Sequence, residues 1–470
     1  MAASRKQPQT MIVASTVALL ALTGCTGSEG TADARTPGAG PAACEQTEQR
    51  TVPQPSAAEF EAAGLSDLPI APDGDRADLV APAFSNPTTV TNPLFPISDL
   101  RSALLNGTVD DKPFRTETTL LPDTRVIEWS PGQCVRTLVS QYVAYLDGRI
   151  EEVALDFYAQ ADDGSVWYFG EDVFNYDGGV VADLSGTWLA GKEGPTAMIM
   201  PADPLVGEVN RPENIPGLVF EEVTVTDTAM TVDGPRGPVE RAIVGQELHD
   251  DGTFSDKIFA PAYGEFYSDH EGDVEALALA VPTDYIDGGV PEELQTMLAA
   301  TATTFEAAES KRWPQASSAR AEMSAAWVQH RESAVPPRLV DPTDRALAAL
   351  DQAIGGRDQL ATQHAALDVR LAVLDLHLQF RAPAEIDLAR MDLWTQRVMV
   401  DAAAADRDAT SGDVATLEWI RDRIARSVDE VTMARIDTDL AELRSAVADE
   451  DLAAAVDSAA SLREVLATAG

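Results

Sequence analysis

The side chains with the clearest chemical potential are two acids, Asp156 and Glu171, which flank an Asp-Gly pair at Asp163-Gly164. Asp-Gly favours a β-hairpin turn, because glycine readily adopts positive φ angles. A turn centred there places Asp156 opposite Glu171. Two like charges facing each other are destabilising unless they spread into solvent, become protonated or hold a cation such as Ca²⁺. We expect spreading into solvent, with weak Ca²⁺ binding at this pair as the alternative.

The same register predicts a hairpin face with too many aromatic residues to be exposed to solvent. Tyr158 lies opposite Phe169 in the predicted ladder. Gln160 lies opposite Trp167 on the same face. An antiparallel sheet with a solvent-exposed side normally carries polar residues there. We therefore expect a cover, which is either another layer of the protein, such as the helical domain, or a small hydrophobic ligand held in a half-open barrel.

Recognisable catalytic patterns are absent from the sequence. It lacks the glycine-rich nucleotide-binding loops, the nucleophile elbow and the two-His-plus-Glu spacing of a zinc helix. His249 is predicted to lie on a strand. His270 is predicted to lie in a polar loop that could collect a cation, although solvated charge is the simpler interpretation. These absences favour a binding or structural role over catalysis, and no catalytic residue or cofactor is assigned.

The N-terminus has the ordered features of a bacterial export signal. Arg5 and Lys6 precede an apolar run over residues 11–22, which is too short to span a bilayer. The following Leu22-Thr23-Gly24-Cys25 resembles the lipobox of bacterial lipoproteins. The resemblance implies a signal peptide over 1–24 and a lipid-modified Cys25, which would anchor the protein outside the cytoplasm. The alternative is a plain secretory signal.

Two other cysteines, Cys44 and Cys134, remain in the chain. Leftover cysteines in an exported protein usually pair, because the compartment is oxidising. We predict a Cys44–Cys134 disulfide, and two free thiols are the alternative.

The composition restricts the partners. The chain has 470 residues, with 77 Asp and Glu against 34 Lys and Arg, and a formal net charge of −43. Such a chain repels nucleic acids and anionic lipid headgroups, so the lipid is the only predicted membrane contact. Arginine strongly exceeds lysine, which suggests a high-GC Gram-positive bacterium, although a salt-adapted surface would also explain the acidity.

The sequence divides into three parts after the signal peptide. Residues 25–78 are rich in small residues and proline, which predicts a disordered tether. Residues 79–285 contain Asp-Gly pairs between short apolar runs, among them Asp147-Gly148, Asp163-Gly164, Asp177-Gly178 and Asp251-Gly252. This pattern predicts an antiparallel β-meander forming a half-barrel or sandwich. Residues 290–470 carry helical periodicity, clearest in the stripe from Leu360 to Leu378. The predicted fold is therefore α+β and multidomain, ending in an all-α helical bundle.

Several segments of the β part are familiar. They are Asp156-Phe157-Tyr158-Ala159-Gln160, the run from Gly164 to Asp172, Met198-Ile199-Met200-Pro201-Ala202 and Phe259-Ala260-Pro261-Ala262-Tyr263-Gly264. Together they resemble a family of uncharacterised bacterial secreted proteins and lipoproteins over roughly residues 86–267. That family has no established activity, so the resemblance implies no site residues.

The resulting hypothesis is a lipid-anchored cell-envelope lipoprotein that binds a ligand or partner, with a hydrophobic small molecule in the β domain as one option. One alternative is a non-catalytic interaction or structural lipoprotein that binds an envelope protein and no small molecule. It predicts a dry interdomain contact and no enclosed pocket. A third is a carboxylate-dependent hydrolase, which needs two carboxyls whose pKa values are pushed apart.

Overall fold

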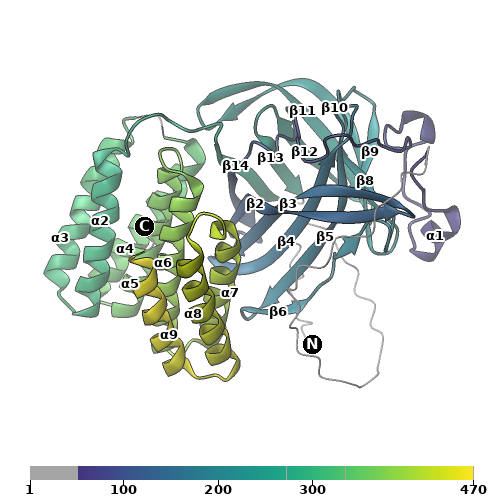
Figure 1. The fold of residues 1–470 in the computed structure, drawn as a ribbon. Coiled ribbons are helices and arrows are strands. Elements are labelled where there is room, and N and C mark those ends of the chain that lie inside the picture. Colours follow the sequence, from purple (N-terminus) through teal and green to yellow (C-terminus); the bar gives the residue numbers. More distant parts are fainter. Residues whose placement is uncertain (1–50, 271, 334, 469–470) are drawn as a thin grey trace, which may run out of the picture.

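The computed structural model describes residues 51–270, 272–333 and 335–468. The predicted signal peptide, the lipidation site Cys25 and Cys44 lie outside the described residues. Within them, a large antiparallel sheet is followed by helices (Figure 1). This confirms the predicted α+β class.

The sheet contains fourteen strands in the described part of the chain. Their bounds are β1 (Ser102–Val109), β2 (Lys112–Ser130), β3 (Gln133–Leu146), β4 (Arg149–Gln160), β5 (Val166–Asp177), β6 (Val180–Asp183), β7 (Trp188–Leu189), β8 (Ala197–Met200), β9 (Val209–Ile215), β10 (Val219–Gly234), β11 (Gly237–His249), β12 (Phe254–Ala260), β13 (Gly264–His270) and β14 (Asp273–Val281).

The sheet curls around an interior, with nearly all neighbours consecutive in sequence. The order is β6-β5-β4-β3-β2-β1-β14-β13-β12-β11-β10-β9, so β1 and β14 pair in the middle. The two ends of the sheet approach each other through β8. This strand pairs with β5, and its Met198 carbonyl accepts a 2.9 Å hydrogen bond from Asn210 of β9. The curled sheet therefore has a buried concave side and a convex side that faces the rest of the protein (Figure 1).

The predicted turns, and the helix predicted from the stripe between Leu360 and Leu378, lie where the sequence analysis places them. The four Asp-Gly pairs named above lie at connections between paired strands, namely β3–β4, β4–β5, β5–β6 and β11–β12. The helices are α1 (Ala57–Ala62), α2 (Glu292–Glu309), α3 (Trp313–His330), α4 (Pro337–Gly356), α5 (Gln359–His377), α6 (Pro383–Ala403), α7 (Arg407–Ile424), α8 (Glu430–Ala448) and α9 (Leu452–Leu466).

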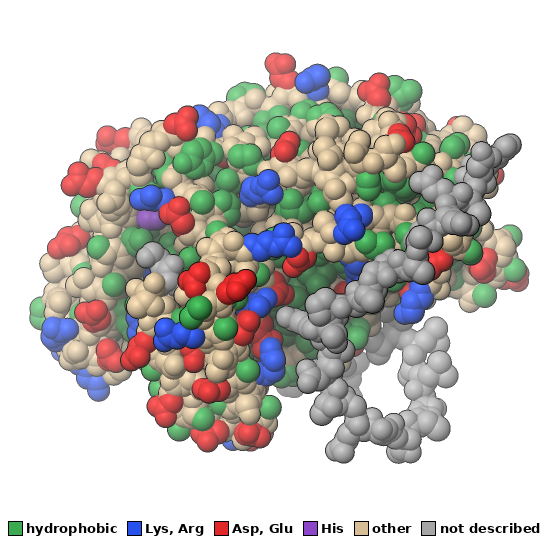
Figure 2. Space-filling model, in the orientation of Figure 1, with side chains coloured by type: hydrophobic (Ala, Val, Ile, Leu, Met, Phe, Trp, Pro, Cys, Tyr) green, Lys and Arg blue, Asp and Glu red, His purple; other side chains and the backbone are tan. Residues whose placement is uncertain are grey.

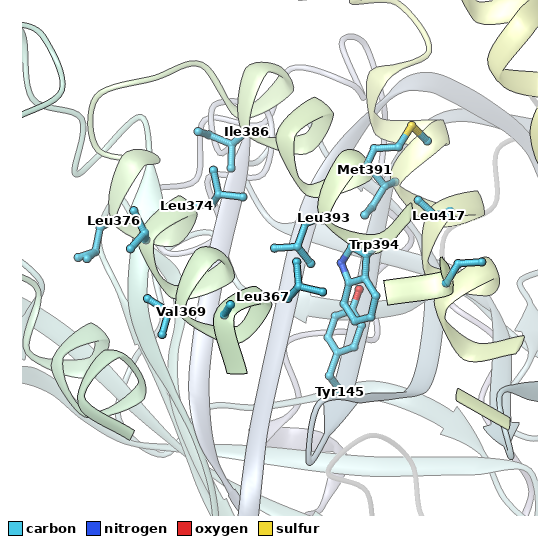
Figure 3. Close-up of a cluster of buried hydrophobic side chains, with 14 of the residues drawn as sticks. Tyr145, Leu367, Val369, Leu374, Leu376, Ile386, Met391, Leu393, Trp394 and Leu417 are labelled. Atoms are coloured by element: carbon cyan, nitrogen blue, oxygen red, sulfur yellow. The ribbon is translucent and has the colours of Figure 1, made fainter. Parts of the chain in front are cut away.

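Helices α2–α9 pack against the convex side of the sheet, chiefly through α7 and α4. One continuous core joins the two layers, since Val143 and Val153 of the sheet pack with the leucines of α5 and α6. Tyr145 stacks on Trp394 of α6 at 5.7 Å between ring centroids (Figure 3). Figure 2 shows acidic side chains scattered over the outer surface of the helices, with Lys and Arg among them.

Buried charges also cross this contact. We call them the interface cluster: Arg115, Glu117, Asp375, Asp387, Arg390 and Arg423. Arg390 Nη2 lies 2.8 Å from Asp375 Oδ1, and Arg390 Nη1 lies 3.3 Å from Glu117 Oε2. Arg423 pairs with Glu117 and donates to Gln141 Oε1 of β3 at 2.6 Å. The interdomain contact is therefore an extension of the core with internally paired charges, and not a loose docking of two domains.

The predicted tether needs correction. Residues 51–78 pack on the curled sheet and are not a disordered segment. Phe60 is buried edge-on against Phe220 at 5.3 Å, and Arg76 Nε pairs with Asp78 Oδ1 at 2.6 Å in a buried position. Ser56 and Glu59 form a reciprocal cap at the start of α1. The low apolar content misled the prediction, because a few anchors and local hydrogen bonds order this segment.

Candidate functional site

A cavity of about 160 Å³ lies inside the curled sheet. Strands from both halves of the sheet form its wall, with β2–β4 on one side and β10–β12 on the other. Leu105, Leu120, Ile199, Ile243 and Phe259 give it an apolar part. Further apolar residues line it as well, and the acids in its wall are Asp156, Glu247, Glu265 and Glu275. A mostly apolar wall with a few polar groups is the usual composition of a small-molecule site.

Two hydroxyls in this wall lack partners. Ser140 Oγ and Tyr142 Oη are buried and have no hydrogen-bond partner among the described residues. Leaving a buried hydroxyl unpaired costs about 1–3 kcal/mol. Burial raises the pKa of Tyr142 well above its ordinary value, with nearby Glu275 and Glu152 acting in the same direction, so its hydroxyl remains a donor. The pair is therefore available to a molecule in the cavity.

The predicted aromatic face is split between the two sides of the sheet. Tyr158 lies opposite Tyr168, and Gln160 lies opposite Val166, because the register shifts between Asp156 and Tyr158. Trp167 instead lies opposite Ala159, on the same face as Phe169. The β-bulge displaces the pairing by one residue, and a displacement of one residue exchanges faces.

The two faces have different covers. Phe169 is fully buried and packs edge-on against Phe84 and Trp129, at 5.6 and 6.4 Å between ring centroids. Trp167 joins the same core cluster. Tyr158, on the other face, lines the cavity and contacts Phe95 at 4.9 Å. Trp167 and Phe169 are covered by other parts of the protein, and of the three predicted aromatics only Tyr158 lines the cavity.

Asp156 and Glu171 lie opposite each other as predicted, but they do not spread into solvent. Both are buried, at 8% and 7% exposure. Burial raises the pKa of Asp156 to about 7, against a hydrogen bond from Tyr168 Oη at 2.9 Å. Burial and Glu213 raise the pKa of Glu171 well above its ordinary value. Protonation is thus the outcome that the structure favours for this pair.

These two acids belong to a larger group that we call the carboxyl cluster. Its members are Glu152, Asp156, Glu171, Glu213, Glu221, Glu247, Glu265 and Glu275, together with Lys257. Burial raises the pKa of Glu152 and of Glu275 to about 8. Lys257 is the one Lys or Arg that lines the cavity within the described ranges. The cavity wall therefore has far more acid than base.

Lys257 neutralises one of these acids. Its Nζ lies 3.1 Å from Glu247 Oε2. Burial alone would raise the pKa of Glu247, but Lys257 and His249 hold it below its ordinary value. Burial and the charge on Glu247 raise the pKa of neighbouring Glu221 well above its ordinary value. Two adjacent carboxyls shifted in opposite directions are the arrangement that acid–base chemistry uses.

The histidines near this end differ from expectation. His270 ends β13 and is buried at 9% exposure, and does not lie in an open polar loop. His249 ends β11, and its ring lies 4.7 Å from that of His270. This contact could not be predicted from sequence, because the two residues are on strands separated by β12.

The remaining predictions about the site have mixed outcomes. Cys134 is disulfide-bonded, but its predicted partner lies outside the described residues, so the pairing stays a prediction. Among the described residues, none of the helices is long and apolar enough to cross a bilayer. No family model matches the sequence, and no curated protein is significantly similar to it. The kinship suggested by the segments between residues 86 and 267 therefore stays a prediction.

Proposed function

We propose that this protein is a lipid-anchored envelope protein that binds a small, mainly apolar molecule carrying a cationic group inside the curled sheet. The observation that carries the proposal is the cavity, whose wall combines an apolar part with an excess of buried carboxyls. The export signal and the lipobox resemblance supply the location and the anchor.

The acids favour a cationic group. Burying several carboxyls near one another is costly unless each is protonated or paired with a positive charge. Asp156 and Glu275 both line the cavity, and Lys257 is engaged with Glu247. An ammonium group could therefore pair with Asp156 or Glu275 while an aliphatic chain contacts Leu105 and Leu120. The unpaired hydroxyls of Ser140 and Tyr142 give further hydrogen bonds.

A purely structural role explains less of this arrangement. The helices cover the convex side of the sheet, so they do not fill the cavity on the concave side. A protein without a small ligand gains nothing from unpaired hydroxyls and surplus acids in its interior. The cavity therefore supports ligand binding over the structural alternative.

The test is native mass spectrometry of the full chain, compared with its denatured mass. We expect a discrete native adduct, retained from expression or taken up from an extract of the source envelope, that disappears on denaturation. Ala103→Phe should abolish the adduct, because Ala103 lines the cavity and a phenyl ring fills it. Val180→Phe, at an exposed position of β6, is the matched control and should retain the adduct.

An adduct of equal intensity in folded Ala103→Phe would contradict the proposal. So would an apo mass for the wild type after incubation with the extract. Tyr142→Phe provides a second variant that removes one hydroxyl without adding volume, and we expect it to weaken the adduct.

A further inference from the structure

A second site lies beside the cavity, where the ends of three strands bring two acids and two histidines together. Glu221 of β10 lies directly opposite His249, the last residue of β11. Glu247 precedes His249 by two residues and therefore points to the same side of β11. One ligand atom from each of Glu221, Glu247 and His249 lies within 4.8 Å of the others.

The distances are close to those of a metal site. His249 Nδ1 lies 3.9 Å from Glu221 Oε1, and His249 Nε2 lies 3.9 Å from Glu247 Oε2. Zinc binds nitrogen and oxygen ligands at about 2.0–2.2 Å, which places neighbouring ligands of a tetrahedral ion about 3.3 Å apart. Only one nitrogen of the His249 ring can bind a given ion, and the ligand atoms of the three residues lie up to 4.8 Å apart. The side chains would therefore have to close by up to about 1.5 Å around one ion.

His270 is an independent observation that points to a ligand. It is more than nine-tenths buried, and its Nδ1 has no hydrogen-bond partner among the described residues. Its ring packs edge-on against the ring of His249 at 4.7 Å between centroids. A buried imidazole nitrogen without a partner is costly, and it is also a good ligand for a transition metal.

The local charge is unbalanced in the direction that favours a cation. Glu221, Glu247 and Glu265 all act on Lys257, which is a single positive charge. Ser255 Oγ, 2.8 Å from His249 Nε2, can orient the ring as a second-shell partner.

We propose that Glu221, Glu247 and His249 bind one divalent transition metal ion, with Zn²⁺ as the best match. The ring of His270 packs beside these three ligands, against that of His249. Imidazole with carboxylate is a donor set that suits Zn²⁺, whereas Ca²⁺ and Mg²⁺ prefer oxygen ligands alone. The site goes beyond the small-molecule proposal, since neither Glu221 nor His249 lines the cavity.

The test is calorimetric titration of the chelator-treated full chain with ZnCl₂, in excess Ca²⁺ to mask exposed carboxylates. We expect one Zn²⁺ per chain, and at least a ~10-fold weaker affinity in both His249→Ala and Glu247→Gln. His364→Ala is the matched control, because His364 pairs with Asp401 in the helical domain and should bind Zn²⁺ like the wild type.

Two further readouts separate coordination from a loss of folding. Co²⁺ in place of Zn²⁺ should give the visible absorption of a low-coordinate site, which His249→Ala should abolish. Lys257→Met should tighten Zn²⁺ binding, because it removes the cation that competes for Glu247. Unchanged affinity in His249→Ala, weaker binding in Lys257→Met, or no saturable uptake by the wild type would overturn the proposal. None of these results depends on the mass-spectrometric adduct.

Discussion

Two groups of buried charges lie on opposite sides of the same sheet, and they are balanced differently. The interface cluster on the convex side has three arginines for three carboxyls, each in direct contact with an opposite charge. The carboxyl cluster on the concave side has eight acids and one lysine. The charges of a balanced buried cluster are neutralised within the protein, whereas an acid-rich one needs protons or a cation from outside. The comparison supports a structural role for the first and the proposed ligand site for the second.

The largest effect should come from breaking the balance of the interface cluster. Arg390→Met leaves Asp375, Asp387 and Glu117 with one fewer partner in a fully buried position. We expect a loss of about 3–5 kcal/mol in the free energy of unfolding, measured by urea denaturation. Arg426→Met, which removes an exposed pair with Asp123, is the control and should cost less than about 1 kcal/mol. Equal losses in the two variants would show that the interface cluster has no special role.

The carboxyl cluster should respond to pH instead. The pKa values of Glu152 and Glu275 near 8 and of Asp156 near 7 lie above those of the unfolded chain, so the folded state retains protons that the unfolded state releases. Their stabilising contribution is complete at low pH and is lost as the pH rises through these values. We expect the free energy of unfolding to fall by about 1–3 kcal/mol between pH 6.5 and 8.5.

The interval between pH 6.5 and 8.5 lies above the range in which two buried histidines titrate. Burial lowers the pKa of His377 to about 4 and also lowers that of His330, so these residues change stability mainly below pH 6.5 and in the opposite direction. Glu152→Gln should reduce the fall measured between pH 6.5 and 8.5. Glu61→Gln, at an exposed position of α1, should leave it unchanged. A pH-independent wild type would contradict the assignment of protonated acids to the interior.

The turns and the helices could be predicted from the sequence, but the two charge clusters could not. Asp163-Gly164 and the stripe from Leu360 to Leu378 are local signals, so they could be interpreted without knowledge of the fold. The bulge after Asp156 depends on packing at both faces of the sheet. The one sequence signal of the bulge is a glycine inside the strand, Gly170. Its φ is +109°, and a Cβ at this position would lie 2.2 Å from the backbone of Trp188.

The clusters depend on long-range topology. Asp156, Glu213 and Glu275 come from strands far apart in sequence, and only the curl of the sheet brings them together. In a chain with 77 acidic residues, no single carboxyl stands out. The pairing of the interface arginines could not be predicted either, because Arg115 lies in the sheet and Arg390 lies in α6.

The most direct test of the central claim is calorimetric titration of the full, chelator-treated chain at pH 7.5 with two probes of equal chain length, hexylamine and hexanoate. The surplus of carboxyls around the cavity predicts saturable binding of one hexylamine per chain, weakened by Ala103→Phe, and no binding of hexanoate. Equal binding of both probes, or binding of hexanoate alone, would contradict the account, since the interior acids would then select no cation.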